Sequence, residues 1–233
     1  MEDRFVRNLG ALTEEECRRL GEKTLLLAGC GGLGGHLLEL LLRAGVGRIV
    51  AADPERFEPT NLNRQILCTG DTLGRSKAEA AAERAAALGL DGRVVPRALR
   101  LDEDNLQELL AGCDAVLDAL DSAEDRRTLK RACDRAGLAY FHGAASGWRA
   151  QAALSLPGDG FLDRLYPPGE VPREAGVLSF APALAAALQA SLCVRWLCGR
   201  PVEPGRLYAL DLREMNWFAL DMAETEEGRG SDA

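Results

Sequence analysis

The sequence predicts an α/β fold built on one doubly wound sheet, mostly parallel, with antiparallel strands near the C-terminus. Short apolar runs alternate with longer helical patterns along most of the chain, as expected when helices connect parallel strands. A glycine-rich turn joins the first apolar run to a helix. The 233 residues, 47% of them hydrophobic, suffice for one sizeable core but are marginal for two. We therefore expect a single domain over residues 1–222.

The first half of the chain supplies the parallel strands. Leu25–Ala28 is an apolar run that ends at glycines, and Leu33–Ala44 carries apolar residues nearly all round, as a helix buried between layers would. Ser76, with Glu79 three residues later, predicts a capping box at the start of a helix that continues to Leu88. Together with helical crossovers, the parallel sheet gains further strands at Arg48–Ala52, Arg93–Val95, Ala115–Leu117 and Leu138–Phe141.

The second half adds strands, a long helix and a tail. Gln151–Leu156 and Leu207–Leu210 are predicted strands, expected to pair antiparallel around a helix from about Ala181 to Leu197. Residues 157–175 are rich in Pro and Gly and form a loop longer than most connections, which marks a candidate lid or partner-binding crossover. Residues 223–233 are polar and acidic, so we expect a flexible tail.

Charge and cysteine content disfavour several classes of function. A net charge of -8 and a pI near 5.0 make nucleic acid and anionic membranes poor partners, and favour proteins or small molecules. Met1–Phe5 lacks an apolar signal core, and the apolar stretches fall short of the roughly 20 residues that a membrane span needs. We therefore expect a cytoplasmic protein. The seven cysteines include no C-x-x-C pair, so burial is the default for most of them.

The segment Gly29–Gly34, G-C-G-G-L-G, directly follows the first predicted strand. Gly29 and Gly31 let the backbone turn tightly and approach phosphate oxygens, while Gly34 permits close packing of the helix whose N-terminal dipole faces the anion. Asp53 lies at the end of the next strand, 19 residues after Gly34, where a carboxylate can accept hydrogen bonds from ribose hydroxyls. This Rossmann-like order predicts an adenosine-containing ligand.

The polar residues after Asp53 favour a triphosphate over a nicotinamide cofactor. The run Asn61-Leu62-Asn63-Arg64-Gln65 follows, and Lys77 comes 24 residues after Asp53. A lysine in the first turn of a helix is unfavourable for the helix by roughly 0.3 to 1 kcal/mol if exposed, but it is well placed to bind an anion. NAD carries only a diphosphate and does not require two further cations. Taken singly, Lys77 and Arg64 are each better explained as solvated surface charges.

Asp121 follows the predicted strand Ala115–Leu117. In an open α/β sheet, ligands sit outside the carboxyl ends of the strands, so Asp121 is expected over the same crevice as the glycine turn. There it would hold Mg²⁺ on the phosphates, because this ion usually takes one or two carboxylates plus substrate oxygens and water. Alternatively, Asp121 or Ser122 simply caps the following helix, and position alone does not decide between the two.

Taken in order, these motifs resemble those of the ubiquitin-activating-enzyme-like adenylyltransferases that serve sulfur carriers, the ThiF/MoeB/HesA group. The resemblance runs from about Arg4 to Asp211 and includes R-F-V-R-N at residues 4–8, which would otherwise look like ordinary charges on a mobile N-terminus. It implies that Asp121 holds Mg²⁺ and that Arg7 is inserted into the ATP site of a neighbouring subunit in a homodimer. The implied ATP-binding residues are Gly29, Gly31, Gly32, Leu33, Gly34, Asp53, Asn61, Arg64, Gln65 and Lys77, and the implied catalytic residues are Arg7, Arg64, Lys77 and Asp121.

The resemblance also implies a reaction and a partner. The C-terminal carboxylate of a small ubiquitin-like sulfur-carrier protein, ending in Gly-Gly, would attack the α-phosphorus of ATP and release pyrophosphate. Many relatives hold zinc with two C-x-x-C pairs, but Gly158–Arg164 contains no cysteine here, so no zinc is expected. Relatives that bind the carrier covalently place a cysteine shortly before an A-G-V segment, whereas Val171–Glu174 precedes Ala175–Val177 here. The chain is therefore expected to stop at adenylation.

Three other functions compete with this one. An enzyme of the same superfamily could activate a carboxylate on a small molecule or a tRNA, as the threonylcarbamoyl-adenosine dehydratases do, although the acidic composition weakly disfavours tRNA. An NAD-dependent oxidoreductase would leave Arg64 and Lys77 unexplained. A binding-only relic would retain the ATP residues without activity. Cys193 and Cys198 lie on an apolar helix and are expected to be buried rather than catalytic.

Overall fold

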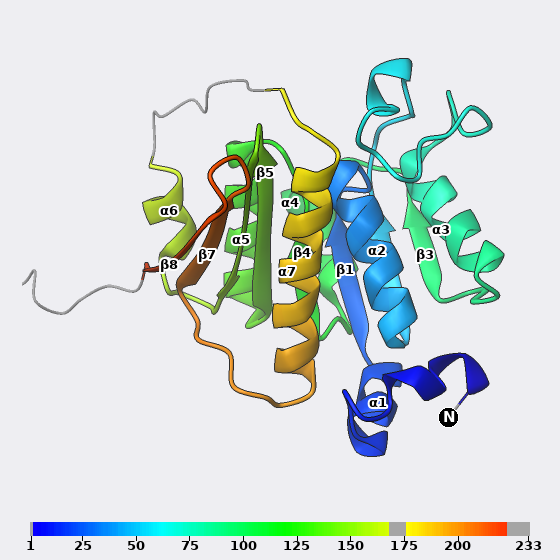
Figure 1. The fold of residues 1–233 in the computed structure, drawn as a ribbon, viewed down its shortest axis with the longest axis horizontal. Coiled ribbons are helices and arrows are strands. Elements are labelled where there is room, and N and C mark those ends of the chain that lie inside the picture. The colour runs from blue at the N-terminus through cyan, green and yellow to red at the C-terminus, as the bar shows by residue number, and fades with distance from the viewer. Residues whose placement is uncertain (1, 168–175, 223–233) are drawn as a thin grey trace, which may run out of the picture.

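The chain folds around one eight-stranded sheet, which the computed structural model describes over residues 2–167 and 176–222. The strands are β1 Thr24–Ala28, β2 Arg48–Ala52, β3 Val94–Arg97, β4 Ala115–Asp118, β5 Ala139–Ser146, β6 Arg149–Ser155, β7 Arg206–Asp211 and β8 Asn216–Asp221. Their order in the sheet is β3-β2-β1-β4-β5-β6-β7-β8 (Figure 1). The first five strands in this order, β3, β2, β1, β4 and β5, pair in parallel. Strands β6, β7 and β8 extend the sheet with antiparallel pairing. The predicted fold class is confirmed.

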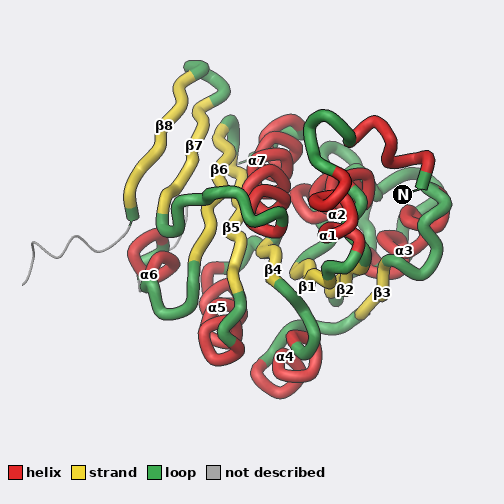
Figure 2. The backbone as a smooth tube through the Cα atoms, turned by 90° about the horizontal axis from the view of Figure 1, so that it is seen from below, coloured by secondary structure: helices red, strands yellow, loops and turns green. Residues whose placement is uncertain are grey.

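Helices cover both faces of this sheet, as Figure 2 shows. They are η1 Asp3–Asn8, α1 Glu14–Gly21, α2 Gly32–Ala44, η2 Pro59–Asn61, α3 Lys77–Ala87, α4 Glu103–Leu110, α5 Ala123–Ala136, α6 Phe161–Leu165 and α7 Phe180–Leu197. Successive side chains of a strand point to opposite faces, so Leu25 and Leu27 of β1 pack with α2, α3 and α7. Leu26 and Ala28 pack with α4, α5 and α6 on the other face. The two layers of core explain why β1 is apolar at every position.

The long apolar helix α7 belongs to this core. It has 18 residues and, over the ranges 2–167 and 176–222, it is the one helix long and apolar enough to cross a membrane. It packs instead against β5, β6 and α2, with half of its residues buried. Its Gln189 is fully buried and donates hydrogen bonds to the carbonyl oxygens of Asp118 and Phe141, at 3.0 and 2.6 Å. These bonds tie α7 to the ends of β4 and β5.

Several elements differ from the sequence prediction. Strand β8 was not predicted, although Trp217–Leu220 is a short apolar run, and all six of its residues are exposed. Within the predicted loop at 157–175, the short helix α6 forms after Gly160, while the rest of that loop from 168 on lies outside the described residues, as does the predicted tail at 223–233. Of the two hydrogen bonds of the capping box predicted at α3, the structure shows the one in which the Ser76 hydroxyl accepts from the Glu79 amide, at 3.4 Å. Near the N-terminus, η1 buries Phe5 against the core.

Candidate functional site

The glycine turn lies where β1 ends and α2 begins, at the carboxyl edge of the parallel strands (Figure 1). Gly29 has φ +95°, and a Cβ on it would lie 2.7 Å from the carbonyl oxygen of Ala119, which follows β4. A Cβ on Gly34 would lie 1.9 Å from the carbonyl oxygen of Gly29. Both positions therefore require glycine for the turn to close against its neighbours. The chain after β4 is thereby held against the glycine turn.

The other two glycines of the turn face the loop after η2. A Cβ on Gly31 would lie 3.6 Å from the Gln65 amide nitrogen, and one on Gly32 would lie 3.5 Å from Cγ of Arg64. These are ordinary contact distances, so packing does not require glycine there. Backbone without side chains beside an arginine is suited to the close approach of a phosphate.

Asp53 closes the site at the end of β2. It is 6% exposed, and its two oxygens accept hydrogen bonds from the amides of Cys30 and Glu55 at 2.7 and 2.8 Å. Burial raises the pKa of the Asp53 carboxyl, and the two amides and the charge of Lys77 oppose this rise. The carboxylate is thus already fixed beside the glycine turn and has acceptor capacity for further donors.

Lys77 reaches this site because two stretches of chain pair with each other. The amide of Phe57 donates to the Arg75 carbonyl at 3.0 Å, and the amide of Lys77 donates to the Glu55 carbonyl at 3.0 Å, which brings the start of α3 beside the end of β2. Lys77 is only 4% exposed, and its ammonium donates to Glu55 at 2.5 Å. Burial raises the pKa of the Cys30 thiol in the glycine turn, and the positive charge of Lys77 opposes this rise. Lys77 is therefore a buried cation at the site, and the solvated-charge interpretation is wrong for it.

The loop after η2 supplies the remaining predicted residues. Asn61 is buried and its Oδ1 accepts from the Glu58 amide at 3.1 Å, while the amides of Arg64 and Gln65 both donate to the Asn61 carbonyl. The Arg64 guanidinium bonds to the Thr60 carbonyl at 3.1 Å and to Asn63 at 2.9 Å. Gln65 is 6% exposed, and its Oε1 is buried with no hydrogen-bond partner among the described residues. An orphaned acceptor beside Gly31 is costly unless a ligand satisfies it.

Asp121 stands on the loop between β4 and α5. The N-cap of α5 is Ser122, whose hydroxyl accepts from the Asp125 amide at 3.3 Å. The capping alternative is therefore decided for Ser122, and the exposed Asp121 carboxylate is not used as a helix cap. It follows Ala119 and Leu120, the two residues nearest to Gly29 across the turn.

These residues fit the nucleotide and the metal that the sequence predicts. Lys77 supplies a buried cation and Gly31 and Gly32 supply uncovered backbone for phosphate groups, while the unsatisfied acceptor of Gln65 suits a hydroxyl or amino donor of the nucleotide. Over residues 2–167 and 176–222, no group of three or more His, Cys, Asp or Glu side chains that could hold a metal is found. A single carboxylate is nevertheless a suitable donor set for Mg²⁺, which takes its other ligands from phosphates and water.

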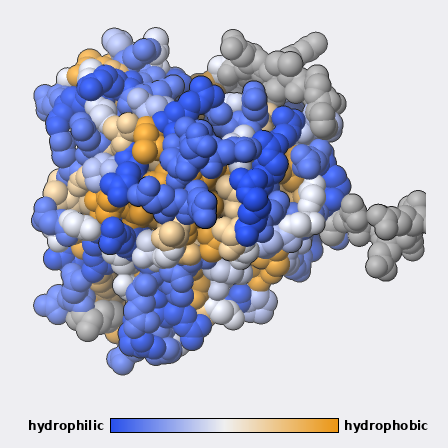
Figure 3. All heavy atoms as spheres, turned by 180° about the vertical axis from the view of Figure 1, so that it is seen from behind, coloured by the Kyte–Doolittle hydropathy of each residue, from blue (hydrophilic) through white to orange (hydrophobic). Residues whose placement is uncertain are grey.

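Hollows elsewhere on the surface involve none of these residues. Two of them share Ala111, Gly112 and Cys113: one of about 310 Å³ lies near the amino ends of β1 and β2, and one of about 630 Å³ near those of β4 and β5. The larger lies between α4 and α5, on the face drawn in Figure 3, where apolar atoms show between hydrophilic ones. Because ligands of open α/β sheets bind at the carboxyl edge, these hollows carry less weight than the glycine turn.

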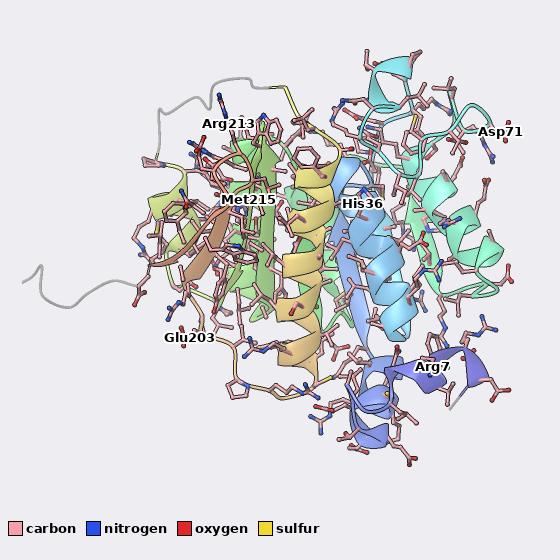
Figure 4. All side chains as sticks on the ribbon, in the orientation of Figure 1. Arg7, His36, Asp71, Glu203, Arg213 and Met215 are labelled. Atoms are coloured by element: carbon pink, nitrogen blue, oxygen red, sulfur yellow. The ribbon has the colours of Figure 1, made fainter. Side chains whose placement is uncertain are left out.

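Arg7 does not join the other predicted residues within its own chain. It lies on η1, and the neighbouring Asn8 donates to the carbonyls of Arg43 and Ala44, both at 3.2 Å, at the far end of α2 from the glycine turn. Figure 4 shows Arg7 at the bottom of the molecule and His36 higher on α2. The 13 residues of α2 separate the two ends by roughly 18 Å at about 1.5 Å per residue. Arg7 therefore lies about the length of α2 away from the glycine turn of its own chain.

A buried polar cluster beside Asp121 was not predicted. It consists of Asp118, Arg126, His142, Gln151 and Tyr166, joined by hydrogen bonds. Asp118 and His142 are fully buried, and Arg126 is 5% exposed. The available signal was His142 itself, one of only two histidines in the chain, placed inside the apolar run of β5.

The cysteines conform to the predicted burial. All seven are free, and all are buried except Cys17, which is intermediate. Burial raises the pKa of Cys193 and of Cys198. Buried thiols with raised pKa values are poor nucleophiles, so neither has the environment of a catalytic cysteine.

Comparison with known proteins matches residues 5–230 to the ThiF family. The SAMP-activating enzyme E1 of Haloferax volcanii is 33% identical over 228 residues, covering 94% of this chain and 82% of that protein. The sulfur carrier protein adenylyltransferase of Thermus thermophilus is 33% identical over 234 residues, covering 94% of this chain and 86% of that protein.

Among solved structures, the crystal structure of E. coli MccB with MccA-N7isoASN superposes with a TM-score of 0.82. It covers 97% of this chain and 73% of that one at 21% sequence identity. At this level of identity the likeness establishes a shared fold.

Proposed function

Because the chain belongs to the ThiF family, we propose that it is an ATP-dependent adenylyltransferase that activates the C-terminal carboxylate of a small ubiquitin-like sulfur-carrier protein. The named relatives with 33% identity are a sulfur carrier protein adenylyltransferase and a SAMP-activating enzyme, which supports this class of substrate. The finer proposal is that the carrier ends in Gly-Gly.

In the proposed reaction, a carboxylate oxygen of the carrier bonds to the α-phosphorus of ATP. The bond from that phosphorus to the oxygen bridging to the β-phosphate breaks, and pyrophosphate leaves. The product is an acyl-adenylate, and no nucleophile from the protein is needed. The chief obstacle is electrostatic, because a carboxylate must approach a polyanion. Fixed cations and a metal that neutralise the phosphates are therefore the expected source of rate enhancement.

The observation that carries the proposal is the position of Lys77 and Arg64 beside the glycine turn. Lys77 is buried and its charge acts on Asp53 and Cys30, and a Cβ on Gly32 would lie 3.5 Å from Cγ of Arg64. Both side chains thus lie beside backbone that suits phosphate. A nicotinamide cofactor would leave both of them without a role.

The other residues take roles that follow from their positions. Asp53 would accept from ribose hydroxyls, Asn61 and Gln65 would offer amide groups to the nucleotide, and Asp121 would hold Mg²⁺. That metal, when bound, would neutralise charge on the phosphates. We further propose that the enzyme is a homodimer in which Arg7 serves the partner subunit's site, because Arg7 lies at the far end of α2 from its own.

Exchange of labelled pyrophosphate into ATP tests the function. We expect exchange when a sulfur carrier ending in Gly-Gly is added, and none when the same carrier lacks its last glycine. Exchange supported by a small carboxylate or by tRNA would instead favour the activation of another substrate. Calorimetry separates the remaining alternatives: tight NAD binding without ATP binding would indicate an oxidoreductase, and ATP binding without exchange by any carboxylate would indicate a relic.

A further inference from the structure

We propose that Arg126 is a positioning residue that holds the Asp121 loop in place for the metal-bound nucleotide. This inference rests on the proposed function, in which Asp121 holds Mg²⁺. Arg126 lies on α5 and is 5% exposed, so it does not itself face the solvent in which a nucleotide would bind. Its effect would pass through the backbone of the residues before Asp121.

The Arg126 guanidinium connects the loop after β4 to the middle of β5. Its Nη2 donates to the carbonyl of Leu120, the residue before Asp121, and to the carbonyl of Gly143 in β5 at 3.2 Å. The Leu120 amide in turn donates to Asp118 Oδ1 at 3.0 Å. Both the amide and the carbonyl of Leu120 are therefore fixed by buried groups. A loop held on both sides in this way leaves the Asp121 backbone little freedom to move.

The opposite side of the guanidinium is held by the rest of the cluster. Nη1 donates to the Tyr166 hydroxyl at 2.8 Å and lies 3.5 Å from Asp118 Oδ2. His142 Nδ1 lies 2.8 Å from the same carboxylate oxygen. Burial would raise the pKa of Asp118, but the Arg126 charge and the His142 hydrogen bond lower it below its usual range. Burial lowers the pKa of His142, so the pair is an Asp118 carboxylate facing a buried arginine.

The contacts of Arg126 favour a role in positioning the loop over a role in stability alone. A buried ion pair gives little net stability, because desolvation offsets most of the attraction, and apolar packing of similar volume often serves as well. Here the guanidinium donates to a carbonyl in the loop after β4 and to one within β5, and that loop begins at Ala119, next to Gly29. An aliphatic side chain would fill the space but would leave the Leu120 carbonyl free.

The test compares Arg126→Lys with Tyr166→Phe in the full chain. Lysine keeps the charge but not the forked geometry, whereas Tyr166→Phe removes one partner of Nη1 and leaves the bond to Leu120 intact. The readout is binding of α,β-methylene-ATP by calorimetry, with Mg²⁺ and with EDTA. We expect Arg126→Lys to weaken binding on the order of tenfold in Mg²⁺, as supporting partners of metal ligands do. Binding in EDTA should be unchanged, and Tyr166→Phe should bind like the wild type in both.

A further variant guards against loss of folding. Arg126→Gln alone would leave Asp118 as an unpaired buried charge, so the double variant Asp118→Asn/Arg126→Gln, which removes both charges, is used, with Tyr166→Phe again as the control. The double variant should lose the Mg²⁺-dependent part of the affinity, and the control should keep it. Equal effects in Mg²⁺ and EDTA, or equal effects in each variant and its control, would overturn the inference.

Asp121→Asn separates this inference from the proposed function. If that variant binds the analogue normally in Mg²⁺, the metal role of Asp121 fails, and the role of Arg126 fails with it. If Asp121→Asn loses the Mg²⁺ effect while the Arg126 variants retain it, the proposed function stands and only the positioning role is wrong.

Discussion

Lys77 and Glu55 form an ion pair of very unequal burial. The Lys77 side chain is 5% exposed and the Glu55 side chain is 65% exposed, and their charged atoms lie 2.5 Å apart. A buried cation needs a counter-ion, but this counter-ion sits at the surface and can rotate into water at little cost. In the proposed function, a phosphate group bound at the glycine turn would replace Glu55 as the partner of Lys77. The ion pair is therefore one that a ligand could exchange at little cost.

Replacing Lys77 by methionine should abolish most activity. Methionine fills a similar space without the charge, so the phosphates would lose a preorganised donor, which typically costs about 10²- to 10³-fold in rate. Carrier-dependent pyrophosphate exchange is the measurement. Arg75→Met is the matched control, because Arg75 is a half-exposed cation two residues earlier that pairs with Glu83. A Lys77→Met enzyme with normal exchange would remove the role assigned to Lys77.

Replacing Glu55 by glutamine should strengthen the binding of ATP. It removes the anion that competes with phosphate for Lys77, so ATP should bind more tightly. Because Glu55 is mostly exposed, the gain should stay within about 1 kcal/mol. Calorimetric titration with ATP measures this, and Glu83→Gln is the control. Weaker ATP binding by Glu55→Gln would mean that Glu55 supports the nucleotide rather than competing with it.

Alanine at two neighbouring glycines should separate folding from binding. A Cβ at Gly34 would meet the Gly29 carbonyl at 1.9 Å, so Gly34→Ala should destabilise the protein by roughly 1–3 kcal/mol or more. A Cβ at Gly32 meets only ordinary contacts, the nearest at 3.5 Å, and alanine favours the helix that begins there. Gly32→Ala should therefore melt no lower than the wild type but bind ATP more weakly. Unchanged ATP affinity in Gly32→Ala would show that phosphate does not approach this backbone.

Mixing two inactive subunits should restore activity if Arg7 acts across a dimer. Arg7→Ala alone lacks the arginine at every site, and Lys77→Met alone lacks the lysine. In a mixed dimer, one of the two sites keeps Lys77 and receives Arg7 from the partner. Exchange should therefore recover, up to about half per mixed dimer, because one site in two is complete.

Two controls accompany the mixing experiment. Arg18→Ala, which removes an exposed arginine of α1, should remain active without mixing. Sedimentation should show a dimer for each variant. A protein that sediments as a monomer, or mixtures that stay inactive, would place Arg7 outside the chemistry.

Acid should remove a stabilising contact between α1 and the chain after α7. Arg200 donates to both oxygens of Glu16, at 2.6 and 2.8 Å, and together with the Thr13 amide it lowers the pKa of Glu16 from 4.5 to about 2. A carboxyl whose folded pKa is depressed gives stability that is present above its unfolded pKa and lost as pH falls through the folded value. The contribution of this pair is therefore complete above pH 4.5 and disappears toward pH 2.

The melting temperature of Arg200→Gln tests this pH dependence. It should lie below that of the wild type at neutral pH, and the difference should shrink as pH falls toward 2. Arg213→Gln, which removes an exposed arginine with a looser ion pair, should show no such trend. A difference that is constant over the whole range would assign the effect of Arg200 to packing rather than to the charge of Glu16.

The parallel half of the fold could be predicted because its signals are local. Strand β2 was expected over the residues at which it occurs, and the glycine turn lies between the predicted strand and the predicted helix. The antiparallel pairing of β6 and β7 was also expected and is confirmed. Strand β8 was missed, because its apolar residues Trp217–Leu220 do not alternate with polar ones. Its pairing with β7 is a hairpin closed by Leu212–Met215, which contain none of the Gly, Asn or Asp residues that mark tight turns in a sequence.

The candidate site, like the fold, was predicted only in part. The residue types at Gly29, Asp53 and Lys77 were singled out from motif order, but their roles toward ATP remain predictions until a nucleotide is bound. Whether Asp121 or Ser122 caps α5 was undecided from position and needed the coordinates. The buried cluster around Arg126 was missed, because its members come from β4, α5, β5, β6 and the end of α6, and a charged residue in a helix looks like a surface residue in sequence.

By itself, the sequence determined the order of the parallel strands and their connecting helices, the glycine turn and the set of polar residues that follow it. These depend on backbone conformation and on hydrophobic periodicity, which act over a few residues. Only the tertiary structure decided that Lys77 is buried beside Asp53, that Arg7 lies away from its own site, and that Arg126 holds the loop before Asp121. Burial and the distance between side chains on different elements depend on how the layers pack, and that information is spread over the whole chain.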